Sequence, residues 1–232
     1  MNCVVISGTE MHGVTERIKG YLLEELHPEV FTEFTLPRDA PAYCTGCKQC
    51  FDVNELRCPH APQVQPIWQA MRAADLLVFV YPVYCLRAPG QVKALLDHLG
   101  VHWFVHRPDP AMFQKRAIIL TQSAGAPNGA AQAEVRTSLH WLGVSSVLRL
   151  GLPLMEAARW EALSEGRRQR LERQVRALGR RVRSLPPPRR SLRSRLFFGL
   201  ARMLHRRDLG EMAPGATPSA DLQYWLDQGW LR

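Results

Sequence analysis

Apolar and polar positions follow two alternating patterns along this chain. Short, almost wholly apolar runs predict buried strands, and stretches with apolar residues three or four positions apart predict helices. The predicted strands are 2–6, 30–36, 76–81, 117–122 and 146–152. The predicted helices are one after residue 13, then 64–74, 88–99, 130–142 and 159–183. Apolar strands that alternate with helices predict an α/β fold, a three-layer sandwich around a five-stranded parallel sheet in the order 2-1-3-4-5.

A small, hydroxyl-rich loop, residues 7–15, follows the first strand. Backbone N–H groups at a helix N-terminus, with the hydroxyls of Ser7, Thr9 and Thr15 around them, can hold a phosphate without a basic side chain. The loop has neither the Walker ending nor the dinucleotide pattern G-x-G-x-x-G, so a mononucleotide such as FMN fits better. The alternative is that its Gly and Thr residues serve only turns and caps.

Ligands of such sheets bind beyond the carboxyl ends of the strands, at the point where the strand order reverses. Here that point lies between the first and third strands. The pattern therefore places residues 7–15 beside residues 82–85, which follow the third strand.

Four of the six cysteines lie in one short segment with the spacing C-x2-C-x2-C-x7-C. They are Cys44, Cys47, Cys50 and Cys58. Three close thiolates and a fourth more distant one can hold a 4Fe-4S cluster. Zinc is the second interpretation, with His60 available beside Cys58, and reduced cysteines without a metal are the third. Their concentration in one segment argues against a secreted disulfide framework.

The net charge of +9 is unevenly distributed. The segment from Arg167 to Arg207 contains 15 arginines and one acid, Glu172, so the rest of the chain carries a net charge of −5. The arginines lack interleaved aromatic residues, and the sequence contains no known nucleic-acid-binding motif, which argues against nucleic-acid binding. No apolar run approaches the ~20 residues of a membrane span, and the N-terminus lacks a basic leader region. We therefore expect a cytoplasmic protein.

A triple proline, residues 186–188, separates the last part of the chain from the rest. We expect residues 1–184 to form the nucleotide-binding domain and residues 185–232 to form a proline linker with a basic, helical, amphipathic extension. Its apolar face comprises Leu192, Leu196, Leu200, Met203 and Leu204.

The basic amphipathic helix has two interpretations. Residues 191–207 can lie on an anionic membrane surface. Alternatively, the helix folds back on the body of the protein and buries Phe197 and Phe198. We favour folding back, because Trp225 and Trp230 further along the chain are suited to anchor it.

The loops at the strand ends resemble those of the NAD(P)H-dependent FMN reductase and iron-sulfur flavoprotein branch of the flavodoxin-like superfamily. The residues that carry the resemblance are 7–15, Tyr-Pro-Val-Tyr at 81–84 with Gly-Gln-Val-Lys at 90–93, and 121–125. The cysteine spacing resembles the motif of the iron-sulfur flavoproteins. The resemblance spans roughly residues 2–155 and continues at 105–108 and 224–230.

The resemblance implies a flavodoxin-like fold, bound FMN and NAD(P)H as co-substrate. It implies that the FMN phosphate is held by Ser7, Thr9, Gly13, Val14 and Thr15. It implies that the isoalloxazine ring is bordered by Pro82, Val83, Tyr84, Cys85, Leu86, Ser123, Ala124 and Gly125. The chain departs from the family at Glu10, where a basic residue or proline is usual, and a carboxylate there weakens phosphate binding unless it points outward.

The expected function is therefore that of a flavin oxidoreductase that passes hydride or electrons to an unidentified small-molecule or protein acceptor, with a 4Fe-4S cluster as a candidate relay. Hydride transfer from a nicotinamide needs no protein base, so we expect no catalytic side chain. The alternatives are an electron carrier without turnover and a redox protein attached to a membrane surface. A homodimer that buries Trp103, Phe104 and Phe113 is a further expectation, and His98, His102 and His106 are expected to be capping or surface residues.

Overall fold

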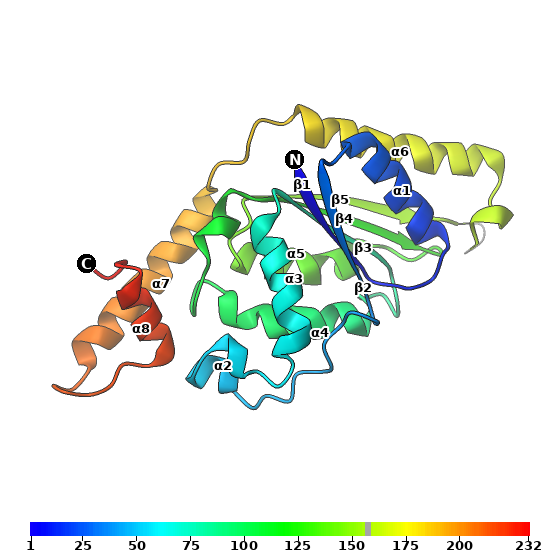
Figure 1. The fold of residues 1–232 in the computed structure, drawn as a ribbon. Coiled ribbons are helices and arrows are strands. Elements are labelled where there is room, and N and C mark those ends of the chain that lie inside the picture. Colours follow the sequence, from blue (N-terminus) through cyan, green and yellow to red (C-terminus); the bar gives the residue numbers. More distant parts are fainter. Residues whose placement is uncertain (156–158) are drawn as a thin grey trace.

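A five-stranded parallel sheet forms the centre of the computed structural model, which describes residues 1–155 and 159–232 (Figure 1). The strands are β1 (Asn2–Ser7), β2 (Val30–Thr35), β3 (Leu76–Pro82), β4 (Arg116–Ser123) and β5 (Ser146–Pro153). They lie in the order β2-β1-β3-β4-β5, which confirms the predicted flavodoxin-like topology. All seven residues of β3 are buried, as expected for the central strand of a sheet that is covered on both faces.

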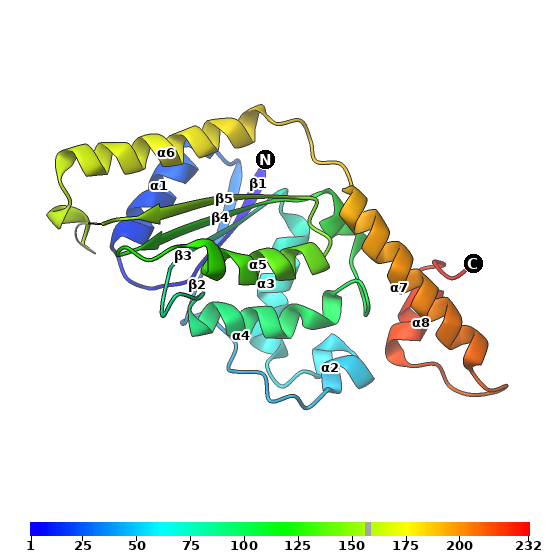
Figure 2. The same ribbon diagram turned by 180° about the vertical axis from the view of Figure 1, so that it is seen from behind.

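Helices cover both faces of the sheet and complete a three-layer sandwich (Figures 1 and 2). On one face lie α1 (Val14–Leu26) and α6 (Glu165–Ser184). Their apolar residues, such as Ile18 and Val175, form one core with the sheet. On the other face lie α3 (Ala61–Ala73), α4 (Gly90–His98) and α5 (Gly129–Trp141), whose apolar residues form a second core.

Two predicted helix starts are shifted in the structure. The long helix predicted from residue 159 begins at Glu165, because Ser164 caps it by accepting a hydrogen bond from the backbone of Arg167. It is preceded by the short 3-10 helix η4 (Trp160–Ala162). The helix predicted from residue 64 begins at Ala61 and has a proline in its first turn, where the missing N–H is tolerated.

Short helical turns that the pattern did not predict fill the connections. The cysteine segment contains α2 (Gln49–Asp52) and η1 (Glu55–Arg57), and the connection from α4 to β4 contains η2 (Leu99–His102) and η3 (Pro110–Gln114).

The C-terminal extension folds back on the body as α7 (Leu192–Glu211) and α8 (Ala220–Asp227) (Figure 2). Phe197 stacks on Trp141 with ring centroids 4.8 Å apart, and Phe198 packs 5.0 Å from Trp225. Trp225 is fully buried, and its Nε1 donates to the carbonyl of His106 at 2.6 Å. The prediction that this helix docks is therefore confirmed.

The apolar face that the sequence pattern singled out on α7 points away from the body. Leu192 is 82% exposed and Leu196 is 61% exposed, and Leu200, Met203 and Leu204 are also exposed. The helix therefore has two apolar sides, one packed on the body and one in solvent. Within the described residues, no helix combines the length and apolarity that crossing a bilayer requires.

We predict that Trp225→Ala lowers the free energy of unfolding by about 3–5 kcal/mol, because it removes a large buried side chain from the contact between the extension and the body. Leu192→Ala, on the exposed side of α7, changes the free energy of unfolding by less than about 0.5 kcal/mol. Urea denaturation followed by circular dichroism measures both. Equal stabilities of the two variants would show that the extension contributes little to the fold.

Candidate functional site

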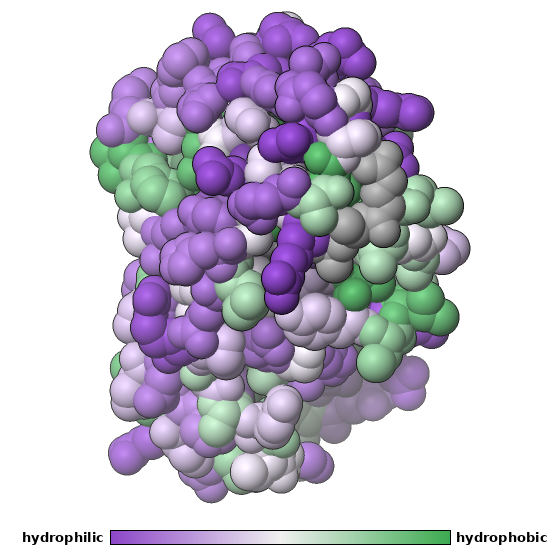
Figure 3. All heavy atoms as spheres, turned by 90° about the vertical axis from the view of Figure 1, so that its right-hand side faces the viewer, coloured by the Kyte–Doolittle hydropathy of each residue, from purple (hydrophilic) through white to green (hydrophobic). Residues whose placement is uncertain are grey.

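The parallel register brings three loops to one edge of the sheet. Ser7 at the end of β1 pairs with Val80, Pro82 at the end of β3 pairs with Gln122, and Ser123 pairs with Pro153. The strands therefore end at nearly the same level, and the loops that follow β1, β3 and β4 lie side by side. Figure 3 looks onto this carboxyl edge, where apolar patches interrupt a mainly hydrophilic surface.

Gly8 sits where the first loop passes closest to the third strand. Its N–H donates to the carbonyl of Val80 at 2.8 Å, and its own carbonyl accepts from Gln91 Nε2 at 2.8 Å. A Cβ atom at this position would lie 2.5 Å from Cβ of Tyr81 and 2.8 Å from Cγ2 of Val92. Only glycine allows this approach, so Gly8 fixes the path of the loop.

The N-terminus of α1 lacks a side-chain cap among the described residues. Gly13 occupies the N-cap position, and a Cβ there would meet nothing within 4 Å. Thr9 Oγ1 accepts from the backbone of Met11 at 3.2 Å, and Thr15 is buried with its Oγ1 3.4 Å from Gln122 Nε2. Uncapped N–H groups at the positive end of a helix fit a phosphate.

Acidic side chains beside the loop are paired or turned outward. Ser7 Oγ donates to Glu33 Oε1 at 2.5 Å, so the hydroxyl proton of Ser7 is not available to a ligand. Lys19 lies 2.6 Å from Glu33 and 2.7 Å from Glu16. Burial lowers the pKa of Lys19, but the hydrogen bonds to Glu16 and Glu33 outweigh burial, so the pKa is raised. Glu10, the departure from the family pattern, is exposed.

The second loop is a tight turn with unfavourable backbone geometry. Tyr84 and Arg87 exchange two backbone hydrogen bonds of 3.0 and 2.9 Å. Between them Cys85 (φ 48°) and Leu86 (φ 65°) both adopt the left-handed conformation, which disfavours bulky residues. Tyr84 is 47% exposed and Leu86 is 53% exposed. Tyr84 therefore does not pack on the core, and the exposed side chains form an apolar border suited to a flat ring.

Hydrogen bonds within the third loop fix its conformation. Ser123 is buried, donates to the carbonyl of Ala126 at 2.6 Å and accepts from Asn128 Nδ2 at 3.1 Å. Ala124 and Gly125 are exposed at the edge. The loop therefore presents its backbone rather than polar side chains to a ligand.

Two glutamines join these loops, and the sequence analysis gave them no role. Gln91, at the start of α4, donates to Gly8, and Gln122, at the end of β4, lies within hydrogen-bond distance of Thr15. Both lie within the stretches that carry the family resemblance, 90–93 and 121–125, but the resemblance assigns them no role.

The cysteine segment is placed on the side of the sheet covered by α3 and α4. Cys44 and Cys47 are exposed, whereas Cys50 and Cys58 are half-buried. Burial raises the pKa of the Cys50 thiol, and the neighbouring Cys58 thiol makes a smaller contribution in the same direction. Cys58 Sγ lies 3.7 Å from His98 Nδ1.

The expectation that the three histidines are capping or surface residues is wrong for two of them. His98 is 8% exposed and His102 is 4% exposed. His102 stacks on Trp68 at 3.9 Å, and burial lowers its pKa to about 4, so it is neutral near pH 7. His106 is partly exposed and lies 2.7 Å from a carboxylate oxygen of Asp221.

A buried arginine connects the cysteine segment to the C-terminal extension. Arg107 Nε donates to Asp221 of α8 at 2.9 Å, and its Nη atoms donate to the carbonyls of Cys50 and Phe51 and to Glu55. The guanidinium therefore fixes α2 and η1 against α8.

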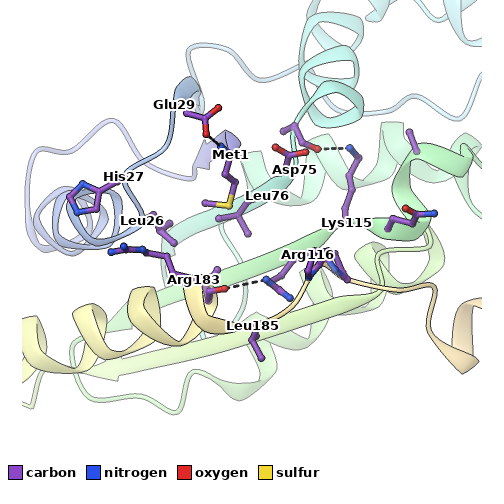
Figure 4. A pocket seen from close by; sticks show the side chains of 16 residues that line it. Met1, Leu26, His27, Glu29, Asp75, Leu76, Lys115, Arg116, Arg183 and Leu185 are labelled. Carbon is purple, nitrogen blue, oxygen red and sulfur yellow. Dashed lines mark hydrogen bonds and ion pairs between the residues drawn. The ribbon is translucent and has the colours of Figure 1, made fainter.

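A cavity of about 660 Å³ lies at the opposite, amino edge of the sheet (Figure 4). It is lined by Met1, Leu76, Lys115 and Arg116, among others. Lys115 Nζ donates to the carbonyls of Arg72 and Ala74, and Arg116 donates to that of Val182 at 3.2 Å. Since these cations are engaged within the protein and ligands of such sheets bind at the carboxyl edge, this cavity is not the nucleotide site.

The fold is flavodoxin-like, and three loops and the uncapped N-terminus of α1 meet at the carboxyl edge of its sheet. The profile of the family described as NADPH-dependent FMN reductase matches residues 1–157. The chain belongs to this family. It is an NAD(P)H-dependent FMN oxidoreductase.

The chain is also similar to individual proteins. It is 27% identical over 154 residues to the iron-sulfur flavoprotein of Methanosarcina thermophila, covering 65% of this chain and 78% of that protein. It shares its fold with the FMN-dependent NADH-azoreductase of Bacillus anthracis, solved in complex with FMN (TM-score 0.57, 14% identity, covering 78% and 99% of the chains). The chain also shares its fold with the NAD(P)H:quinone oxidoreductase of Methanothermobacter marburgensis (TM-score 0.58, 14% identity, covering 79% of this chain and 97% of that one).

We predict that Gly8→Ala raises the dissociation constant for FMN by at least about ten-fold, because the added methyl group displaces the loop from Tyr81 and Val92. Quenching of FMN fluorescence measures the constant. Gly20→Ala, in the middle of α1 with open space around it, is the matched control and leaves the constant unchanged. If a folded Gly8→Ala variant bound FMN as tightly as the control, the loop would not be part of the site.

Proposed function

We propose that this reductase holds FMN across the three loops of the carboxyl edge. The phosphate lies at the N-terminus of α1, against the amides of Val14 and Thr15 and the hydroxyls of Thr9 and Thr15, whereas the amide of Gly13 is bound to the carbonyl of Met11. The ring lies between residues 82–86 and residues 123–125. The observation that carries the proposal is the uncapped N-terminus of α1 at the same edge as the two other loops.

The roles of the individual residues follow from their surroundings. Thr15 accepts from Gln122, which leaves its own hydroxyl proton for a phosphate oxygen. Ser7 positions the start of the loop and does not donate to the phosphate, because its hydroxyl is bound to Glu33 and its carbonyl accepts from Leu36. Pro82, Val83 and Cys85 shape the turn that presents Tyr84 and Leu86.

Bound FMN supplies the redox chemistry, since flavins accept a hydride from a nicotinamide and release electrons singly or in pairs. The chain's own task is to bind and orient. The backbone of Ala124 and Gly125 is exposed toward the ring position, and the apolar side chains of Tyr84 and Leu86 keep water from it. No side chain has to move a proton in the hydride step.

The open, partly apolar edge favours a small, flat, oxidised molecule as the acceptor. Azo compounds and quinones, the substrate classes in the names of the two fold relatives, are suitable probes of this class. A 4Fe-4S cluster on Cys44, Cys47, Cys50 and Cys58 stays a prediction from the cysteine spacing, supported by the name of the sequence relative. The hydride step proposed here does not depend on it.

We predict that the FMN-loaded protein oxidises NADPH or NADH continuously in the presence of a quinone or azo dye. Thr15→Val raises the dissociation constant for FMN by about ten-fold or more, because it removes a hydrogen bond to a charged group. Thr137→Val, on the exposed side of α5, is the control and keeps both FMN affinity and turnover.

Absorbance at the nicotinamide band measures the turnover. A protein whose flavin is reduced once by NAD(P)H and is then reoxidised only by a protein partner would be an electron carrier, which is the alternative function. Equal FMN binding by both threonine variants would contradict the proposed phosphate site.

The outward side of α7 favours a second role, attachment to an anionic membrane surface. Its exposed leucines lie beside the exposed Arg195 and Arg206. Apolar side chains flanked by arginines fit the boundary between acyl chains and anionic headgroups. Figure 1 shows α7 at the end of the molecule away from the carboxyl edge, so attachment would leave the flavin site open.

We predict that the protein co-sediments with phosphatidylglycerol-containing vesicles at low salt and still does so at about 150 mM salt, where exposed charges are largely screened. Leu196→Glu combined with Leu200→Glu lowers the binding by at least about ten-fold, because two apolar side chains no longer insert. Leu56→Glu, exposed in η1, is the control. Binding lost at 150 mM salt, or a dimer that covers α7 in light scattering, would contradict membrane insertion.

A further inference from the structure

Three side chains of metal-ligating types converge beside α4. Cys58 directly follows η1, His60 caps the start of α3 and His98 ends α4. Cys58 Sγ lies 3.7 Å from His98 Nδ1, and His60 Nδ1 lies 3.2 Å from His98 Nε2. One ligand atom from each of the three residues lies within 4.8 Å of the others.

The separation between Cys58 Sγ and His98 Nδ1 suits two ligands of a single ion. A metal bound to sulfur at about 2.3 Å and to imidazole nitrogen at about 2.0–2.1 Å in tetrahedral geometry places its ligand atoms about 3.3–3.6 Å apart. His60 Nδ1 lies next to the other ring nitrogen of His98, so the His60 ring has to rotate to join them. One ligand atom of each residue already lies within 4.8 Å of the others.

The surroundings of His98 match those of a metal-bound histidine. Its Nε2 lies 2.9 Å from the carbonyl of Ala42, an acceptor, so Nε2 carries the proton. The lone pair of Nδ1 then faces Cys58. A metal-bound histidine usually donates its other ring N–H to a carbonyl or carboxylate, which fixes the orientation of the ring, and burial of His98 keeps the ring in place.

A four-cysteine cluster also needs Cys58, so the cluster and this group exclude each other. Cys44 and Cys47 are exposed, and the group of ligands that the described residues bring together contains two imidazoles and one thiolate. Mixed thiolate and imidazole ligands are typical of mononuclear zinc sites, whereas a cubane of this type takes four thiolates.

We propose that Cys58, His60 and His98 bind one divalent transition-metal ion of the zinc class. The fourth coordination position falls to water or to Cys50, the other half-buried thiol of the segment. The ion fixes the cysteine segment to α3 and to the C-terminal end of α4. The opposite end of α4 carries Gln91, which holds Gly8 of the flavin loop. The site is independent of the proposed flavin function.

Cobalt(II) is the probe, because its bonds to thiolate and imidazole give distinct absorption bands. The full-length, metal-free protein is titrated with Co²⁺, and metal content is measured by mass spectrometry. We expect one Co²⁺ per chain and a thiolate-to-cobalt band. Cys58→Ser abolishes the band where water is the fourth ligand and lowers it by about half where Cys50 is, and His60→Gln, a change at a half-buried residue, weakens cobalt binding by at least about ten-fold.

Two control variants separate this site from other metal chemistry. Cys44→Ser and His27→Asn, the latter at an exposed left-handed position where asparagine is tolerated, keep one Co²⁺ and the band. Anaerobic reconstitution with iron and sulfide is run in parallel on all variants. FMN content is measured on the same samples, so loss of metal and loss of flavin are distinguished.

Two results would overturn the proposal. The first is iron and sulfide bound in equal amounts, lost in Cys44→Ser and retained in His60→Gln, which would establish a four-cysteine cluster. The second is cobalt binding that is absent or unaffected by Cys58→Ser and His60→Gln.

Discussion

Parallel pairing of β1 with β3 is the constraint on which the site depends. It aligns Ser7 with Val80, so the chain leaves β1 directly beside the end of β3. The loop can pass there only because Gly8 has no side chain to meet Tyr81 and Val92. The same pairing sets where α1 begins and therefore where its free N–H groups point. The proposed phosphate site and ring site both depend on this one register.

Most of the fold could be predicted from the sequence. The apolar runs identify every strand of the sheet. Four of the strands contain buried residues, whereas the edge strand β2 contains none and was located by its Val, Phe and Thr content. The helix starts at Ala61 and Glu165 were missed, because they depend on proline tolerance and on capping by Ser164, which apolar periodicity does not record.

The site could be predicted only in part. Loops next to strand ends carry small and hydroxyl residues, and that pattern located residues 7–15. The use of the Ser7 hydroxyl by Glu33 and the bridging by Gln122 could not be predicted, because both depend on partners more than 25 positions away. His98 was missed for the same reason: its partners, Ala42 and Cys58, lie on the segment before α3.

The C-terminal extension and the cysteine segment form one connected region. Arg107 binds Asp221 of α8 and the backbone of the cysteine segment, and Trp225 donates to the carbonyl of His106. Loss of either contact leaves a buried polar group unpaired, which carries a large penalty in free energy. The extension therefore supports the cysteine segment as well as covering the core.

The account rests on a phosphate held at the N-terminus of α1, and the most direct test compares FMN with riboflavin, which has the same ring without the phosphate. Dissociation constants of both flavins for the full-length protein are measured by fluorescence quenching. Several charge-assisted hydrogen bonds predict that FMN binds at least about 100-fold more tightly. Equal affinities would show that the loop after β1 does not hold a phosphate, which would contradict the account.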